Sequence, residues 1–268
     1  MTAIIAATST RADHETRPPN GLMLLAKGRF LLERAAFYGL RSRLAALPSG
    51  DGHPVLVFPG FLASDRSTAA LRTVLSDLGY QARGWGLGRN IRVDLELVEA
   101  MERLIQNMAQ SAGRKVSLVG WSLGGIFARE LAKLHPDAVR QVITLGSPIR
   151  DDRRHTNASS LFEWVNGKEP ELLRHGRFTG LDRAPPMPTT AILSRSDGIV
   201  HWTGSVQEPA SGHERTENII VRGSHLGLVH NPGAILAMAD RLRQDENHWQ
   251  PFIPPASLRW MFPPQELP

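Results

Sequence analysis

A serine between two glycines, with an apolar run before it and a helical pattern after it, constrains the fold of this chain more than any other feature. The serine is Ser122, in the sequence G-W-S-L-G of residues 120–124. Residues 116–119 are apolar and β-branched, as in a buried strand, whereas residues 126–134 have the spacing of a helix. G-x-S-x-G in this context is typical of a sharp strand-to-helix turn that exposes the serine hydroxyl. We therefore predict that Ser122 is a reactive side chain.

The same alternation of strands and helices continues along the chain. Strands are predicted at residues 54–58, 80–85, 115–119, 139–145, 189–194 and 218–221, and helices at about residues 65–78, 93–112, 123–135 and 232–243. Such alternation implies right-handed crossovers and a parallel sheet with helices on both faces. Functional sites in these sheets form at the carboxyl ends of the strands. Ser122 lies at such an end.

A serine hydroxyl is a weak nucleophile, so the turn predicts a histidine base and a carboxylate that orients it. Asp197 comes directly after the strand predicted at residues 189–194, and His225 directly after that at 218–221. Both are therefore expected at the same edge of the sheet as Ser122. The alternatives follow a strand less directly; they are His201, His213, His230, Asp182 and Asp240.

Four segments together resemble the α/β-hydrolase-fold serine hydrolases. GWSLGG, SRSDGIV and GSHLG occur in the expected order, and PGF followed by ASD resembles the oxyanion loop of bacterial lipases and esterases. The resemblance covers about residues 53–243 and implies an α/β-hydrolase fold, with a mostly parallel twisted sheet and helices on both faces. The pattern of this chain adds a small cap insertion and an N-terminal helix to that fold. The resemblance also implies a carboxylesterase or lipase that forms an acyl-enzyme on Ser122, with Asp197 and His225 as catalytic partners and the backbone N–H groups of Phe61 and Leu123 as the oxyanion hole.

The chain divides into an N-terminal arm and helix (1–48), a core (49–247) with a cap insertion (148–188), and a proline-rich tail (248–268) that we predict to be irregular. An uncharged stripe in the helical segment 21–47 is expected to pack on the domain, although the segment also resembles a basic amphipathic helix that contacts a membrane surface. The stripe contains Leu24, Leu31, Leu32, Ala35 and Tyr38. Family members usually begin with antiparallel strands, so we expect a reduced sheet. Four residues are predicted to line the substrate cleft or to pack in the core: Trp85, Leu87, Trp202 and Leu226.

Composition excludes several classes of function. The chain has no cysteine, which removes disulfides and thiolate chemistry, and its ten histidines show no metal-ligand spacing. A net charge of +5 comes without a long run of basic residues, so no nucleic acid partner is expected. We expect no cofactor and no metal, and the absence of a signal peptide pattern predicts a cytoplasmic protein.

Several reactions fit the same three residues. A thioesterase, lactonase, amidase or acyltransferase would use the same acyl-enzyme, and a non-catalytic binding protein of this fold would hold a ligand in its cleft. Dehalogenases and epoxide hydrolases are disfavoured because their turns carry aspartate where this chain has Ser122. The substrate expected is a small-molecule or lipid ester, and the sequence leaves its acyl chain and the oligomeric state open.

Overall fold

The computed structural model describes residues 29–150, 178, 180–208 and 215–267. Six strands form one sheet in the order β2-β1-β3-β4-β5-β6, and all neighbouring pairs are parallel. The strands are β1 Pro54–Phe58, β2 Gln81–Gly84, β3 Val116–Trp121, β4 Val139–Leu145, β5 Thr189–Leu193 and β6 Thr216–Ile220. The prediction of six strands in a parallel sheet is confirmed.

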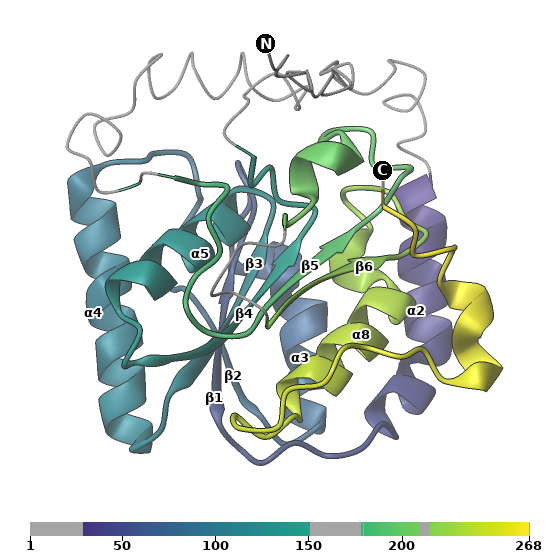
Figure 1. Ribbon diagram of the computed structural model, residues 1–268, viewed down its shortest axis with the longest axis horizontal. Helices are drawn as coiled ribbons and strands as arrows, with labels where there is room; N and C mark the ends of the chain where they lie inside the picture. Colours follow the sequence, from purple (N-terminus) through teal and green to yellow (C-terminus); the bar gives the residue numbers. More distant parts are fainter. Residues whose placement is uncertain (1–28, 151–177, 179, 209–214, 268) are drawn as a thin grey trace, which may run out of the picture.

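Helices cover both faces of this sheet (Figure 1). The α-helices are α2 Arg29–Ala45, α3 Ala69–Asp77, α4 Leu95–Ala112, α5 Leu123–Leu134 and α8 Pro232–Leu242, and the 3-10 turns are η2 Asp65–Thr68, η4 Trp202–Ser205, η5 Leu228–His230 and η6 Ala256–Met261. Helices α4 and α5 pack on one face through residues such as Met101 and Phe127. Helices α2, α3 and α8 pack on the other through Phe37, Leu75 and Ile235. None of the described helices is long and apolar enough to span a bilayer.

Capping residues explain where the helices begin and end. The Asp94 side chain accepts a hydrogen bond from the N–H of Leu97 (2.9 Å) at the start of α4, and Asn231 does the same for Ala234 (3.0 Å) at the start of α8. These contacts satisfy N–H groups that lack a partner within the helix. Gly113, with a φ of 58°, ends α4 in the left-handed conformation that glycine adopts most easily.

The N-terminal helix forms as predicted over its described part, but the prediction of its packing face is wrong. The predicted stripe lies on the solvent side, which holds Leu31, Leu32, Ala35 and Tyr38; Leu32 is 72% exposed. Phe37 and Leu44 are buried instead. The face that packs also carries Glu33, which binds the loop after β6, so a search for an uncharged stripe selected the opposite side. Leu24 lies outside the described residues.

Two further predictions concern the cap and the tail. Most of the cap predicted at residues 148–188, including its helices at 160–165 and 169–175, lies outside the described residues. The tail was predicted to be irregular, which is wrong for η6. Phe262 follows this turn and is buried in the same core as α2, α3 and α8. The guanidinium of Arg241, in α8, lies 5.6 Å from the ring centre of Phe252. Residues of the tail therefore pack against the helices on this face of the sheet.

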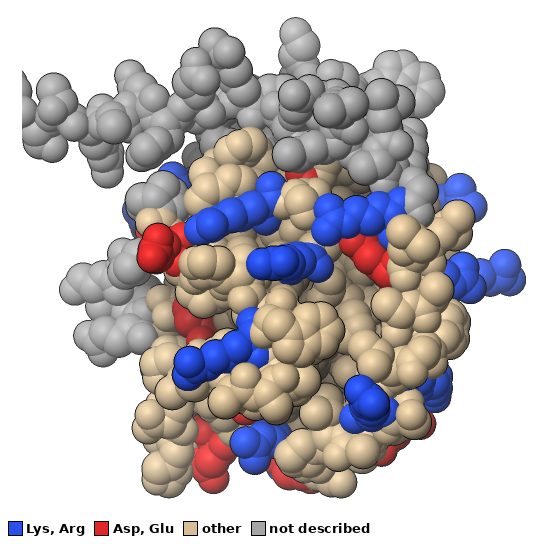
Figure 2. All heavy atoms as spheres, turned by 90° about the vertical axis from the view of Figure 1, so that its right-hand side faces the viewer, with Lys and Arg blue, Asp and Glu red and all other residues tan. Residues whose placement is uncertain are grey.

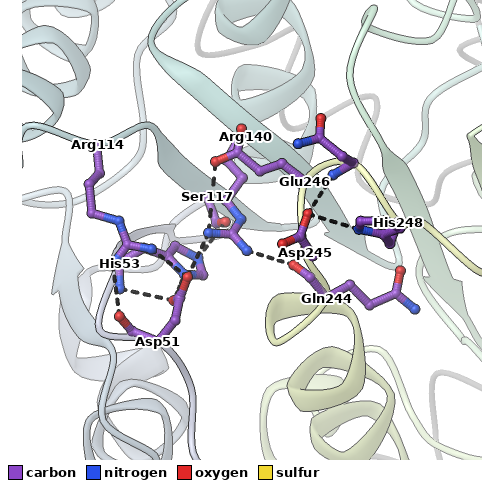
Figure 3. A network of polar contacts seen from close by, with 10 residues as sticks. Asp51, His53, Arg114, Ser117, Arg140, Gln244, Asp245, Glu246 and His248 are labelled. Atoms are coloured by element: carbon purple, nitrogen blue, oxygen red, sulfur yellow. Dashed lines mark hydrogen bonds and ion pairs between the residues drawn. The ribbon is translucent and has the colours of Figure 1, made fainter.

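A partly buried polar network joins the amino ends of β1, β3 and β4 (Figure 3). His53 donates through Nδ1 to Asp51 (2.5 Å), because a carboxylate can only accept, and its Nε2 accepts from the hydroxyl of Ser117 (2.7 Å). Arg140 donates to the same carboxylate (2.8 Å) and to the carbonyl of Gln244 (2.6 Å). His53 and Ser117 are fully buried, so this Ser–His–Asp set is closed to substrates, and we infer that it is structural.

Acidification is expected to destabilise the fold through this network. Burial lowers the pKa of His53, and the positive charges of Arg140 and Arg114 act in the same direction against the raising effect of Asp51. The unfolded chain, with an ordinary histidine pKa near 6.5, therefore binds the proton first. The free energy of unfolding then falls as the pH drops below about 6.5.

Urea unfolding at about pH 7.5 and about pH 5 tests this expectation. His53→Gln should reduce the loss of stability between the two pH values, whereas His248→Gln, at an exposed position, should keep the wild-type loss. Burial alone would raise the pKa of Asp51, but hydrogen bonds from His53 and Arg140 outweigh it and hold that pKa well below its usual range. Asp51 therefore loses its stabilising effect only at still lower pH. An identical pH dependence in wild type and His53→Gln would contradict the role of His53.

Candidate active site

Ser122 connects β3 to α5 with a strained backbone. Its φ is 54° and its ψ is −122°, a region that side-chain-bearing residues enter at a cost of about 1–3 kcal/mol. Its N–H donates to the carbonyl of Leu145 (2.9 Å), and its carbonyl accepts from the N–H of Gly125 (2.9 Å). These bonds hold the predicted strand, turn and helix in place. Strain of this kind clusters at functional sites.

The glycines around Ser122 are required by close backbone contacts. A Cβ at Gly120 would lie 2.3 Å from the carbonyl oxygen of Gly124, and one at Gly124 would lie 2.5 Å from that of Phe58. Gly125, directly after the G-x-S-x-G pattern, is also tightly packed: a Cβ there would lie 1.9 Å from the hydroxyl of Ser147. The turn therefore depends on all three glycines.

Asp197 and His225 follow β5 and β6, and their side chains are bonded to each other. Nδ1 of His225 lies 2.6 Å from Oδ2 of Asp197, and the residues are 4% and 3% exposed. The other carboxylate oxygen, Oδ1, accepts from the N–H groups of Ile199 and Val200, each at 2.8 Å. The carboxylate is thus fixed on both oxygens, and it can orient the imidazole so that Nε2 remains available to exchange a proton.

Two contacts connect this pair with the turn at Ser122. Trp121 donates its indole N–H to the carbonyl of His225 (3.1 Å), and the ring centres are 5.9 Å apart. A Cβ at Gly146, directly after β4, would lie 3.0 Å from the Asp197 carboxylate. Within the described structure the Ser122 hydroxyl makes no hydrogen bond to His225. Such bonds are often long before a substrate binds and tighten in the complex.

The loop after β1 lies against the serine. A Cβ at Gly60 would lie 3.3 Å from the Cβ of Ser122. Phe61 comes next in this loop, and Leu62 has a φ of 62°, so the backbone is sharply turned there as well. Leu123 begins α5, where the first N–H groups have no partner within the helix. The two amides predicted for the oxyanion hole, those of Phe61 and Leu123, thus belong to the two segments beside Ser122.

Asn90 holds this loop, although no sequence motif marks it. Its side-chain amide donates to the carbonyl of Pro59 (2.7 Å). Its own carbonyl accepts from the N–H of Leu62 (2.7 Å), and its N–H donates to the carbonyl of Ala63 (2.8 Å). Asn90 is fully buried. It therefore fixes the backbone on both sides of Phe61.

Helix α2 reaches the histidine loop through Glu33, the second residue that the sequence did not reveal. Oε1 of Glu33 accepts from the N–H of Ser224 (2.7 Å), and Oε2 accepts from the hydroxyl of Ser224 (2.5 Å). A Cβ at Gly227 would lie 1.5 Å from Oε2, so a side chain there would displace the Glu33 carboxylate. Because Ser224 directly precedes His225, Glu33 fixes the loop that carries the imidazole.

The four residues predicted to line the cleft or core lie in different surroundings. Trp85 is buried, and its indole N–H donates to the carbonyl of Gly88 (3.0 Å). Leu87 packs on the same core cluster, beneath α4 and α5. Trp202 packs on a small separate cluster that includes Leu193. Leu226 is 37% exposed and directly follows His225. It is the only one of the four that directly follows Ser122, Asp197 or His225 in the sequence.

The alternative histidines and acids lie in other surroundings, and Asp182 is exposed. Nδ1 of His201 lies 2.6 Å from the hydroxyl of Thr203, and Asp240 pairs with Arg241 and Arg243. The ring of His230 packs edge-on against Phe37 at 5.6 Å. His213 lies outside the described residues. Within the described ranges, no group of three or more metal-ligating side chains is present.

Comparison with known sequences identifies a family model and a partial relative. The model, described as alpha/beta hydrolase fold, matches residues 52–167. The biotin biosynthesis bifunctional protein BioHC of Teredinibacter turnerae is 29% identical in an alignment of 127 residues that covers 44% of this chain and 21% of that protein. The chain therefore matches about a fifth of the length of this relative.

Solved structures share the architecture. Lipase B of Aspergillus fumigatus superposes with a TM-score of 0.56 at 21% identity, over 72% of this chain and 53% of the lipase. An alpha/beta superfamily hydrolase from Oenococcus oeni PSU-1 gives a TM-score of 0.52 at 17% identity, over 74% of this chain and 94% of the hydrolase. At these identities the likeness shows the fold, and one fold supports many activities.

Proposed function

We propose that this chain, which has the α/β-hydrolase fold, is a serine hydrolase that cleaves carboxylic esters through an acyl-enzyme on Ser122. The observation that carries the proposal is the strained Ser122 at the same sheet edge as the bonded pair of His225 and Asp197. The likeness to a lipase and to a hydrolase supports a hydrolase in general. That the bond cleaved is an ester and that Ser122 is the nucleophile are our proposal from the site residues.

In the proposed reaction, the Ser122 oxygen attacks the carbonyl carbon of the ester while Nε2 of His225 takes the hydroxyl proton. The charge that develops on the carbonyl oxygen is stabilised by the N–H groups of Phe61 and Leu123. The alcohol leaves with the proton from Nε2, and the acyl group stays on Ser122. Water then attacks with the same help from His225, which releases the acid and restores the serine. Asp197 remains ionised and holds the imidazole.

Turnover of p-nitrophenyl esters of graded acyl-chain length tests the proposal and defines the acyl group. Steady hydrolysis of at least one ester by the purified chain is the expected result, and no hydrolysis of any member would contradict it. A competing alcohol or thiol separates hydrolysis from acyl transfer, and thioester, lactone and amide substrates test the alternatives on the same residues. A binding protein without activity would retain ligand affinity but turn over none of these compounds.

Glu33→Ala is expected to lower kcat for the best ester by about tenfold to a hundredfold, because a small displacement of the base is costly to the rate. KM should change little, since Glu33 is argued to act through Ser224 and not on the substrate. Glu33→Gln keeps the acceptor oxygen for one of the two bonds and should restore part of kcat. Glu96→Ala, at an exposed position in the first turn of α4, is the matched control. Wild-type kcat in a folded Glu33→Ala variant would contradict this positioning role.

We also propose that α2 makes a peripheral membrane contact. Its solvent side presents Leu31 and Leu32, 62% and 72% exposed, beside the exposed Arg34 and Arg43. Basic residues are scattered over the surface on this side of the molecule (Figure 2), as suits an anionic bilayer. Leu31→Ser with Leu32→Ser should reduce sedimentation with phosphatidylserine vesicles; unchanged sedimentation would count against the contact.

A cytoplasmic location stays a prediction from the sequence.

A further inference from the structure

A cavity of about 430 Å³ lies between α2, the start of α3 and η5. Its apolar walls include Phe30 from α2, Trp121 from the end of β3 and Val229 from η5. The volume falls within the usual range of small-molecule sites, and such sites combine apolar walls with a few polar groups. The polar groups here include Arg34 and Arg66.

The two arginines bring positive charge to the cavity. Within the described residues, neither Arg34 nor Arg66 forms an ion pair with a carboxylate; Arg34 lies 5.9 Å from the ring centre of Tyr38. The acids next to them in sequence are committed elsewhere. Glu33 accepts from Ser224, and Asp65 accepts from the backbone N–H groups of residues 85 and 86, each at 3.0 Å.

His230 also lines the cavity, but it adds no charge near neutral pH. Burial lowers its pKa, and the positive charge of Arg34 acts in the same direction. Its ring lies edge-on against Phe30 at 5.9 Å, and its Nδ1 is buried without a hydrogen-bond partner in the described part of the chain. The cavity thus combines apolar and aromatic walls with two guanidinium groups.

We infer that this cavity binds a single-chain amphiphile with an anionic head, chemically a fatty carboxylate or an alkyl phosphate. Guanidinium groups pair well with the oxygens of both heads, and the alkyl chain would lie against Phe30, Trp121 and Val229. Leu226 lies on the same wall, so the ligand would contact the chain neighbours of both Ser122 and His225. The inference concerns binding alone and holds whether or not Ser122 reacts.

Isothermal titration of the full chain tests the inference with four probes, each below its micelle concentration: dodecanoate, dodecyl phosphate, dodecyltrimethylammonium and inorganic phosphate. We expect at least one of the two anionic amphiphiles to bind with a stoichiometry of one, and the tighter of them identifies the head group. Weaker binding of the cationic amphiphile and of inorganic phosphate is also expected. Equal affinity for the cation, equal affinity for inorganic phosphate, or no binding of either anionic amphiphile would overturn the inference.

Variants place the ligand in this cavity. Arg34→Gln and Arg66→Gln should each lower the affinity for the anionic amphiphile about tenfold, which corresponds to about 1.4 kcal/mol of binding free energy. Arg103→Gln, an exposed arginine on α4, should leave its affinity unchanged. The double variant Arg34→Glu with Arg66→Glu should reverse the preference toward the cationic amphiphile while the urea midpoint stays close to that of wild type. Wild-type affinity in both glutamine variants would place the ligand elsewhere and overturn the inference.

Discussion

Replacing Ser122 by alanine is expected to lower kcat for the best p-nitrophenyl ester by about 10⁶-fold, the loss typical of a serine nucleophile that acts together with a histidine. KM should change little, because the proposed oxyanion donors, the amides of Phe61 and Leu123, are backbone groups that the substitution leaves in place. Initial rates at several ester concentrations measure both constants. Ser111→Ala, on the exposed end of α4, is the matched control and should behave as wild type.

The same position offers a test of stored strain. Ser122→Gly should also abolish turnover, yet it should raise the free energy of unfolding by about 1 kcal/mol, because glycine adopts a φ of 54° without the penalty of a side chain. Urea unfolding of both variants measures the difference. A glycine variant less stable than the alanine variant would show that the turn at Ser122 is relaxed, and the argument from strain would then fail.

Asp197→Asn is expected to lower kcat by about 10⁴-fold. The asparagine oxygen can still accept from the N–H groups of Ile199 and Val200, so its NH₂ group would face Nδ1 of His225. That contact favours the tautomer with the proton on Nε2, and an imidazole in this form cannot take the proton of Ser122. Kinetics on the best ester measure the effect.

Asp245→Asn makes the same chemical change at an exposed carboxylate. It is the control, and its kcat should equal that of wild type. The urea midpoint of Asp197→Asn should stay near that of wild type, because the two backbone bonds survive. A loss of kcat smaller than about tenfold in a folded Asp197→Asn variant would mean that another group orients His225.

The local pattern of the sequence was sufficient to predict the sheet and to place Ser122, Asp197 and His225 directly after strands. Strands of apolar, β-branched residues and the glycines around Ser122 are short-range signals. Each depends only on residues a few positions away in the sequence, so it can be recognised without the tertiary structure. Asp197 and His225 could be predicted because parallel strands bring their carboxyl ends to one edge, whatever the packing between the helices. The structure joins these two residues at 2.6 Å.

Contacts between distant segments escaped prediction for a physical reason. Glu33 and Ser224 are 191 residues apart, and a glutamate on a helix gives no local sign that it will bind a loop. Asn90 is similar, because its partners lie in the loop after β1. The packing face of α2 was predicted wrongly for the same reason. Glu33 is charged, and without knowledge of its bond to Ser224 the face that carries it was assigned to the solvent.

The network of Ser117, His53 and Asp51 shows why residue types and distances are insufficient. Its bonds of 2.7 and 2.5 Å resemble those of a catalytic set. Yet Ser117 is fully buried within β3 and has no positive φ, whereas Ser122 is partly exposed on a strained turn. Exposure and backbone conformation distinguish the two serines, and neither could be read from the sequence.

Covalent labelling with a fluorophosphonate tests the central claim most directly, because the reagent modifies an activated serine and needs no knowledge of the natural substrate. We predict that intact-mass analysis shows the addition of one phosphonyl group and that peptide mapping places it on Ser122. The adduct should be absent from Ser122→Ala and strongly slowed in His225→Gln. Labelling of another residue, or undiminished labelling of Ser122→Ala, would contradict the account.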